Sequence, residues 1–219
     1  MNVAILYSGL INDFSAFYEN HKIYIYQDYN IDFFISTYIY NDQSDLLIDR
    51  INTLLQPKNI DIEIYKNLES YFLNYKNEYI KKHTKDCRPI NSLSMFYKIK
   101  KSFNNILNMN IYDIIIRNRF DIKFNSKINL CKNNELNVPC GGDYKGGLMD
   151  LFAYGNPLIM NQYCNLFDFI PIYMKDDIYF HPESILRYHC QKQNIPINRF
   201  NFDIFLRGRN FTKSAPCYN

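Results

Sequence analysis

The amino-acid sequence predicts an α/β fold in which a mostly parallel central sheet is flanked by helices. Short apolar runs typical of buried strands alternate along the chain with stretches whose apolar residues recur at helical spacing. The connections between these stretches are short, and no internal repeat is apparent. This order is typical of an open α/β sheet. The 219 residues suffice for one substantial core, so we expect a single domain over residues 1–219.

The first half opens on an apolar strand at residues 2–7 that leads into a tight turn at Ser8 and Gly9. A helix is expected through Phe14 and Tyr18. Further strands are predicted over residues 31–37 and 60–65, and further helices over residues 43–55, 68–82 and 92–107.

The second half begins with a strand over residues 111–116, whose isoleucines predict burial on both faces. A glycine-rich segment spans residues 141–147. The other elements predicted here are strands over residues 136–138, 151–155 and 200–206 and helices over residues 156–169 and 182–193.

Composition limits the class of protein. The net charge is only +3 and the basic residues are scattered, so a track for nucleic-acid phosphates is not expected, whereas a small anionic ligand is easily accommodated. The six cysteines form no C-x-x-C pair, which argues against zinc-finger and thioredoxin-like sites. We expect free thiols in a reducing compartment. The N-terminus does not resemble a signal peptide, and no apolar run reaches the roughly 18 residues of a transmembrane helix, so a soluble cytoplasmic protein is expected.

The strongest candidate site follows the strand of residues 111–116, in the sequence Arg117-Asn118-Arg119-Phe120-Asp121. Ligands of open α/β sheets bind at the carboxyl ends of the strands. Arginine contacts phosphate directly and aspartate binds Mg²⁺ or Mn²⁺, so this cluster predicts a site for a nucleotide diphosphate. A surface ion pair at the strand end is the alternative interpretation.

The order of these motifs resembles that of glycosyltransferase-like proteins of large DNA viruses and bacterial polysaccharide gene clusters. The resemblance rests on Ser8-Gly9, residues 31–37, residues 112–121, residues 150–155 and His181-Pro182-Glu183. It implies a GT-A-like (Rossmann-like) fold with a nucleotide-binding half at residues 1–124 and an acceptor- and metal-completing half at residues 125–219. The abundance of Asn, Ile, Lys and Tyr is in keeping with an AT-rich genome, such as that of a giant virus or a low-GC microbe, and a viral protein would lie in the host cytoplasm or the virion.

The resemblance also implies an activity and its partners: transfer of a sugar from a nucleotide-sugar donor, UDP- or GDP-linked, to a glycan or another hydroxyl acceptor. In that family a D-x-D motif binds Mn²⁺ or Mg²⁺. Here Arg119 takes the place of the first aspartate and Asp121 remains as the metal ligand. Metal dependence is therefore open, because arginine supplies part of the positive charge itself. His181 resembles a further metal ligand, although His181-Pro182-Glu183 equally fits an ordinary helix start.

Two carboxylates are candidate catalytic residues. Asp150 follows the glycine-rich segment and would deprotonate the acceptor hydroxyl if the reaction inverts the sugar, with a turn-forming or capping aspartate as the alternative. Glu183 is the second candidate. Neither inversion nor retention is predicted.

Further residues are candidates for binding the donor. Ser8 and Gly9 offer a turn that the nucleotide can approach closely. Ser94, Tyr97 and Lys98 share one helical face and either point toward the donor or form an ordinary helix surface. Arg207-Gly208-Arg209 is either a closing loop for a diphosphate or a solvated basic tail. His189 is expected to be structural, and His21 and His83 to be solvated.

Two other functional classes are compatible with these residues. A catalytically silent nucleotide-sugar or glycan-binding protein, or a virion-associated one, is favoured by the missing first aspartate. A metal-dependent phosphoryl transferase or nuclease would need Asp113, Asp121 and Asp150 to converge, but Asp113 is predicted at the opposite end of its strand.

Overall fold

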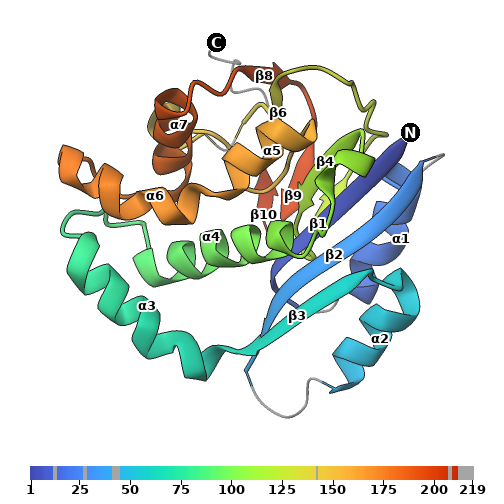
Figure 1. Ribbon diagram of the computed structural model, residues 1–219, viewed down its shortest axis with the longest axis horizontal. Coiled ribbons are helices and arrows are strands. Elements are labelled where there is room, and N and C mark those ends of the chain that lie inside the picture. Colours follow the sequence, from blue (N-terminus) through green and yellow to red (C-terminus); the bar gives the residue numbers. More distant parts are fainter. Residues whose placement is uncertain (12–13, 27–28, 41–44, 142, 207–208, 212–219) are drawn as a thin grey trace.

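The computed structural model describes all residues of the chain except 12–13, 27–28, 41–44, 142, 207–208 and 212–219 (Figure 1). Its strands are β1 (Asn2–Leu10), β2 (Asn30–Ile39), β3 (Asn59–Ile64), β4 (Ile114–Asn118), β5 (Ile122–Phe124), β6 (Leu136–Pro139), β7 (Ala153–Gly155), β8 (Ile197–Phe200), β9 (Ile204–Leu206) and β10 (Arg209–Phe211). Its α-helices are α1 (Ser15–Tyr24), α2 (Asp45–Leu55), α3 (Tyr65–Tyr79), α4 (Pro89–Asn104), α5 (Pro157–Cys164), α6 (Leu166–Tyr173) and α7 (Pro182–Lys192).

The main sheet has seven strands in the order β3-β2-β1-β4-β7-β6-β8. The four strands from β3 to β4 are parallel, and β7 then runs antiparallel to both β4 and β6, while β6 and β8 are parallel. A smaller antiparallel sheet has the order β10-β9-β5. The predicted fold class, α/β with a mostly parallel central sheet flanked by helices, is confirmed.

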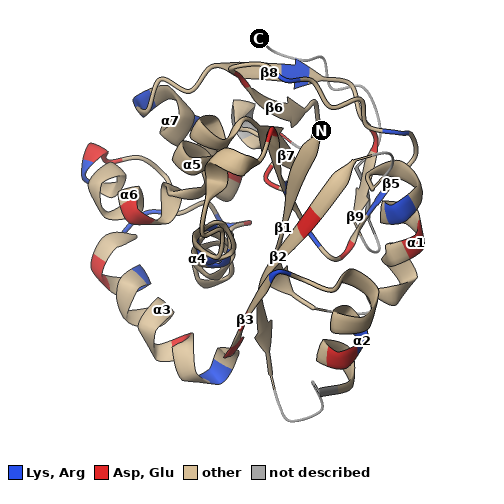
Figure 2. Cartoon of the chain, turned by 45° about the vertical axis from the view of Figure 1, so that its right-hand side comes forward, with Lys and Arg blue, Asp and Glu red and all other residues tan. Residues whose placement is uncertain are grey.

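Helices cover both faces of the main sheet. In Figure 1, α1 and α2 lie on one side and α4, α5 and α6 on the other, with α4 crossing in front of β1. Helix α4 packs on β1 and β2 and also contacts α3, α5 and α6. Acidic and basic residues are interspersed over α1, α2 and α3 alike (Figure 2).

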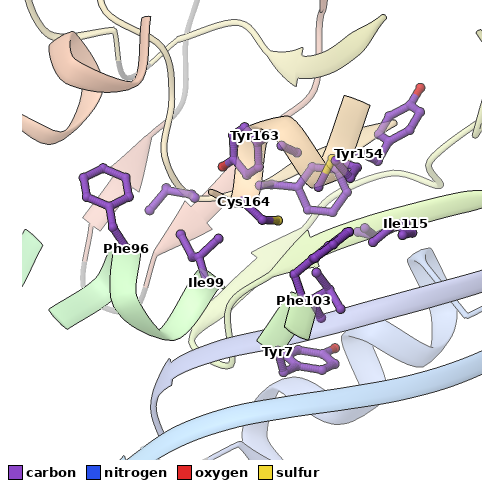
Figure 3. Close-up of a cluster of buried hydrophobic side chains, with 14 of the residues drawn as sticks. Tyr7, Phe96, Ile99, Phe103, Ile115, Tyr154, Tyr163 and Cys164 are labelled. Carbon is purple, nitrogen blue, oxygen red and sulfur yellow. The ribbon is translucent and has the colours of Figure 1, made fainter. Parts of the chain in front are cut away.

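The core explains why β4 is so apolar. Residues Ile114, Ile115 and Ile116 are fully buried, as expected for a central strand with helices on both faces. On one face, Phe96, Ile99 and Phe103 of α4 lie opposite Tyr163 and Cys164 of α5, with Ile115 of β4 beside them (Figure 3). This packing fixes the strand whose carboxyl end leads to Arg119 and Asp121.

Several elements differ from those predicted. Strand β1 continues through Ser8 and Gly9 to Leu10, so these two residues lie at its carboxyl end rather than in a turn after it. The predicted strand over residues 200–206 is two strands, β8 and β9, which belong to different sheets and are separated by residues 201–203. Strand β5 was not predicted, because its three residues are too few to show a period.

The predicted helix over residues 156–169 is two helices that meet at Asn165. Pro171 lies inside α6, where its ring nitrogen cannot donate to the carbonyl of Phe167. The hydroxyl of Tyr75 donates to that carbonyl instead, at 3.0 Å. Packing against α3 therefore compensates for a proline that would otherwise leave a carbonyl unpaired.

Two further expectations concern the cysteines and membrane-spanning segments. Cys87, Cys131, Cys164 and Cys190 have free thiols, but the expectation fails for Cys140, which is disulfide-bonded. Among the described helices, none has both the length and the apolar composition needed to cross a bilayer.

Candidate functional site

A cavity of about 350 Å³ opens where the carboxyl ends of four parallel strands meet the first turns of α4. Residues from the ends of β1 to β4, from α4 and from the segment before β7 line it. They are Ser8, Gly9, Leu10, Tyr38, Tyr40, Tyr65, Asn91, Ser92, Ser94, Met95, Arg119, Phe120, Asp121 and Asp150. The structure thus brings together six of the candidate site residues from four separate parts of the sequence, namely Ser8, Gly9, Ser94, Arg119, Asp121 and Asp150.

Arg119 and Asp121 form a bidentate ion pair in the wall of this cavity. The Nε of Arg119 donates to Oδ1 of Asp121 at 2.8 Å, and Nη2 donates to Oδ2 at 2.9 Å. The side chains are 26% and 16% exposed, so solvent reaches both only partly. Two parallel, charge-assisted hydrogen bonds of this kind fix the geometry of the pair as well as its charge.

A buried hydrogen-bond network fixes the backbone at the end of β4. The amide oxygen of Asn118 accepts from the backbone N–H of Arg119 at 2.9 Å, and its amide nitrogen donates to the hydroxyl of Tyr7 at 3.1 Å. That hydroxyl lies 2.6 Å from Nδ1 of His21 and 2.5 Å from the hydroxyl of Tyr26. The prediction that His21 is solvated is therefore wrong: it is fully buried, and burial lowers its pKa to about 4.

At the end of β1, the backbone takes a conformation that suits glycine. Gly9 has a φ of +110°, which side-chain-bearing residues rarely adopt, and its carbonyl accepts from the hydroxyl of Thr37 at 2.7 Å. The neighbouring Ser8 is 3% exposed, and its Oγ has no hydrogen-bond partner among the described residues. Buried polar groups nearly always have a partner, so this hydroxyl is available to a ligand or a water.

Arg117 does not reach the cavity, contrary to the expectation that it binds the nucleotide. It is fully buried, and its Nη1 donates to the backbone carbonyl of Asp150. Burial lowers the pKa of Arg117 below its ordinary value. The role visible in the structure is structural: a buried guanidinium holds the segment that carries Asp150 against β4.

The glycine-rich segment packs directly against the start of α7. The backbone N–H of Leu148 donates to the carbonyl of Glu183 at 3.0 Å, and Arg187 donates to the carbonyl of Gly146 at 3.0 Å. A Cβ at Gly147 would lie only 2.5 Å from the carbonyl carbon of Glu183. Glycine at position 147 is what allows this contact, which leaves Asp150 facing the cavity.

His181 and Glu183 lie behind this segment rather than in the wall of the cavity. Nδ1 of His181 is 2.6 Å from Oε2 of Glu183, and the His181 ring stacks on Tyr144 with centroids 3.9 Å apart. Burial, together with the charges of Asp150 and Asp143, raises the pKa of Glu183 to about 8. The two residues predicted for metal binding or catalysis, His181 and Glu183, are therefore in contact with each other.

Tyr97 and Lys98 face β3 rather than the cavity. Nζ of Lys98 is fully buried and lies 3.0 Å from Asp61 and 2.5 Å from Glu63, while the hydroxyl of Tyr97 donates to Glu63 at 3.1 Å. The same ammonium lies 4.5 Å from the ring centroid of Tyr38. Lys98 therefore supports a residue of the cavity wall from behind instead of contacting a ligand.

An aromatic wall of the cavity was not predicted from the sequence. The rings of Tyr38 and Tyr65 lie 5.4 Å apart and those of Tyr40 and Tyr65 5.1 Å apart, at the ends of β2 and β3. The start of α4 adds Asn91 and Ser92. Their position in the sequence was the available signal for a site, because each of these tyrosines stands at or just after the end of a strand. Tyrosine is too common in this chain, however, for position to identify these three as site residues.

Other predicted residues fall elsewhere. Asp113 precedes β4 and accepts from the backbone N–H of Asn2 at 2.8 Å, so it does not converge with Asp121 and Asp150. His189 is buried between Tyr173 and the carbonyl of Gln162, in agreement with a structural role. Arg207 and Gly208 lie outside the described residues.

The cavity offers few side-chain ligands for Mg²⁺ or Mn²⁺. In the part of the chain that the structure describes, no three His, Cys, Asp or Glu side chains gather as metal ligands. Two carboxylates, Asp121 and Asp150, nevertheless line the same cavity. Because such ions are commonly held by one or two carboxylates plus substrate phosphates, the cavity fits a divalent ion that arrives with a diphosphate.

The fold resembles that of a known sugar transferase. The crystal structure of mouse xyloside xylosyltransferase 1, apo form, is similar over 91% of this chain and 85% of that chain, with a TM-score of 0.54 and 10% sequence identity. No protein-family model and no curated protein matches the sequence. At this identity the similarity shows the fold alone, which is GT-A-like.

Proposed function

We propose that this protein is a glycosyltransferase that moves a sugar from a nucleoside-diphosphate donor to a hydroxyl acceptor. The observation that carries the proposal is the cavity at the carboxyl ends of β1 to β4, where an arginine and two carboxylates meet an aromatic wall. Open α/β sheets bind nucleotides at this edge. The glycosyltransferase-like fold supports the same function.

The wall of the cavity offers a place for each part of the donor. The rings of Tyr40 and Tyr65 provide apolar surface for a nucleobase, and Tyr40 is 57% exposed. Arg119 provides positive charge for a diphosphate, and the amino-terminal end of α4, which carries the positive end of the helix dipole, lines the same cavity. The unpartnered hydroxyl of Ser8 is a further donor at the same edge. UDP- or GDP-linked sugars have this combination of groups.

Asp150 is the proposed base. If the reaction inverts, its carboxylate takes the proton of the acceptor hydroxyl while the acceptor oxygen bonds to the anomeric carbon and the diphosphate leaves with the electron pair of the broken bond. Asp121 would hold Mn²⁺ or Mg²⁺, which when bound stabilises the negative charge of the leaving diphosphate. Arg119 stabilises the same charge directly.

A thermal-shift screen with UDP-, GDP- and CMP-sugars, each with and without Mn²⁺, tests the proposal. A donor raises the melting temperature because it binds only the folded protein; at about 100 times its Kd it adds about 2.7 kcal/mol of stability. We expect a shift with one nucleotide class. The shift should be lost in Arg119→Ala and retained in Arg50→Ala, which removes an exposed arginine of α2. Absence of a shift with every nucleotide contradicts the proposal.

A catalytically silent nucleotide-sugar or glycan-binding protein is the second candidate. The ion pair between Arg119 and Asp121 favours it, because a carboxylate held by a guanidinium is less available to a metal. Donor hydrolysis and transfer to an acceptor separate the two functions. Binding of a donor without either reaction, in the presence of Mn²⁺, would favour the silent protein.

A further inference from the structure

The ion pair of Arg119 and Asp121, hereafter the Arg119–Asp121 latch, occupies the groups that a donor and a metal would each need. Both oxygens of the Asp121 carboxylate accept from the Arg119 guanidinium, and both side chains line the cavity. The inference below rests on the proposed function, because it concerns how this site takes up its ligands.

A divalent ion alone is disfavoured at the closed latch. It would have to displace the guanidinium from at least one Asp121 oxygen and would then lie beside a second positive charge. Partial burial strengthens this repulsion, since the two side chains are 26% and 16% exposed. Breaking the bidentate pair without a new partner for Arg119 leaves a desolvated charge.

A diphosphate alone is disfavoured for the opposite reason. Among the described residues that line the cavity, two carboxylates face one guanidinium, so a diphosphate adds negative charge to a wall that is already acidic. The guanidinium is also committed to Asp121, which leaves only its remaining N–H groups for phosphate. Buried Arg117 does not help, because its Nη1 bonds the backbone of Asp150 behind the wall.

Both penalties disappear when the two ligands arrive together. Asp121 would then hold the ion, and the Arg119 guanidinium would be free to turn to the phosphate. The side chain can make this turn without moving β4, because the backbone N–H of Arg119 is held by Asn118. We propose that the Arg119–Asp121 latch couples the binding of a divalent cation to that of a nucleoside diphosphate, so that each ligand opens the site for the other.

Direct binding measurements test the coupling without relying on activity. Mn²⁺ is titrated into the protein and free Mn²⁺ is followed by electron paramagnetic resonance, with no nucleotide, with UDP or with GDP. UDP and GDP are titrated separately by calorimetry with EDTA or with Mn²⁺. One nucleotide is expected to tighten Mn²⁺ binding by about tenfold or more, and Mn²⁺ should tighten that nucleotide by the same factor because coupling is reciprocal.

Two variants test whether the latch causes the coupling. In Arg119→Gln the carboxylate is released, so Mn²⁺ alone should bind about fivefold or more tighter than to wild type while the coupling falls. In Asp121→Asn the guanidinium is released, so the nucleotide in EDTA should bind tighter than to wild type and no longer respond to Mn²⁺. Arg50→Gln on α2 is the matched control and should behave as wild type. Circular dichroism establishes that each variant is folded.

The outcomes separate the latch from the function on which it rests. If a nucleotide binds wild type equally well in EDTA and in Mn²⁺, the donor site stands and the latch is overturned. The latch is also overturned if Arg119→Gln leaves the affinity for Mn²⁺ alone unchanged or weakens it. If folded wild type binds no nucleotide under any condition, the proposed function fails and the latch fails with it.

Discussion

Asp150 reaches the cavity because its backbone is held from behind. The buried guanidinium of Arg117 donates to the backbone carbonyl of Asp150, while the side chain of Asp150 lines the same cavity as Arg119. We expect Asp150→Asn to lower sugar transfer by about a hundredfold or more, as for loss of a general base, with nucleotide affinity retained. Steady-state kinetics and calorimetry measure the two effects, and Asp49→Asn on α2 is the matched control. A folded Asp150→Asn protein with undiminished transfer would rule out this role.

Glu183 makes the stability of the protein depend on pH. Its pKa rises from 4.5 to about 8 on folding because of burial and the nearby charges of Asp150 and Asp143. Between these two pH values the folded state binds more protons than the unfolded state. The contribution of Glu183 to the free energy of unfolding is therefore fully present below pH 4.5 and is lost as the pH rises through about 8.

The melting temperature should therefore fall more steeply for wild type than for Glu183→Gln as the pH rises from 4.5 to about 8. Glutamine remains neutral and keeps the size of the side chain, so the variant should be the more stable protein at the upper end of this range. If the melting temperatures of the two proteins instead fall equally as the pH rises, Glu183 ionises in the folded state at its ordinary pKa.

At the scale of elements, the contact between the glycine-rich segment and α7 places Asp150. Gly147→Ala puts a methyl group 2.5 Å from the backbone of Glu183, so either the segment or the helix must shift. We expect a loss of about 1–3 kcal/mol in the free energy of unfolding, as for overpacking, together with reduced transfer. Denaturant unfolding and activity assays measure both.

Gly146→Asn is the matched control for Gly147→Ala. Position 146 has a φ of +74° and open space around its would-be Cβ, and asparagine tolerates this conformation better than other residues. Gly146→Asn should lower the free energy of unfolding by less than Gly147→Ala does. Equal losses in both variants would mean that flexibility of the segment matters, rather than the contact with Glu183.

In helix α4, the periodic pattern predicts which residues share a face but not what that face contacts. Ser94, Tyr97 and Lys98 do share a face, as their spacing predicts, but only Ser94 lines the cavity. One turn later the same face meets Asp61 and Glu63 of β3. The spacing of residues defines a face, whereas its neighbours at each turn depend on the lateral order of the strands.

In strand β4, the alternation of side chains does not predict which arginine reaches the cavity. Arg117 and Arg119 have the same parity, so alternation alone does not separate them. The strand ends at Asn118, which leaves Arg117 buried within the sheet and places Arg119 beyond it. The apolar run predicted the strand, but the point at which it emerges from the core depends on α5 and β7, which lie later in the sequence.

For the whole molecule, the order of most strands and helices was predictable because most elements have a local period, whereas β5 is too short to show one. Assembly of the cavity was predictable in part, since carboxyl ends of parallel strands meet at one edge and bring Ser8 and Asp121 together. Asp150 lies at the same edge because β7, which it precedes, runs antiparallel to β4. The pairing of His181 with Glu183 was not, because it depends on where α7 begins relative to the glycine-rich segment.

The central claim is that the cavity at the carboxyl ends of β1 to β4 binds a nucleotide-sugar donor. A crystal structure with the nucleotide selected by the thermal-shift screen, grown with Mn²⁺, tests it most directly. The account predicts the diphosphate between Arg119 and Asp121, with the base against Tyr40 and Tyr65. A nucleotide bound elsewhere on the molecule, with this cavity unchanged, would contradict it.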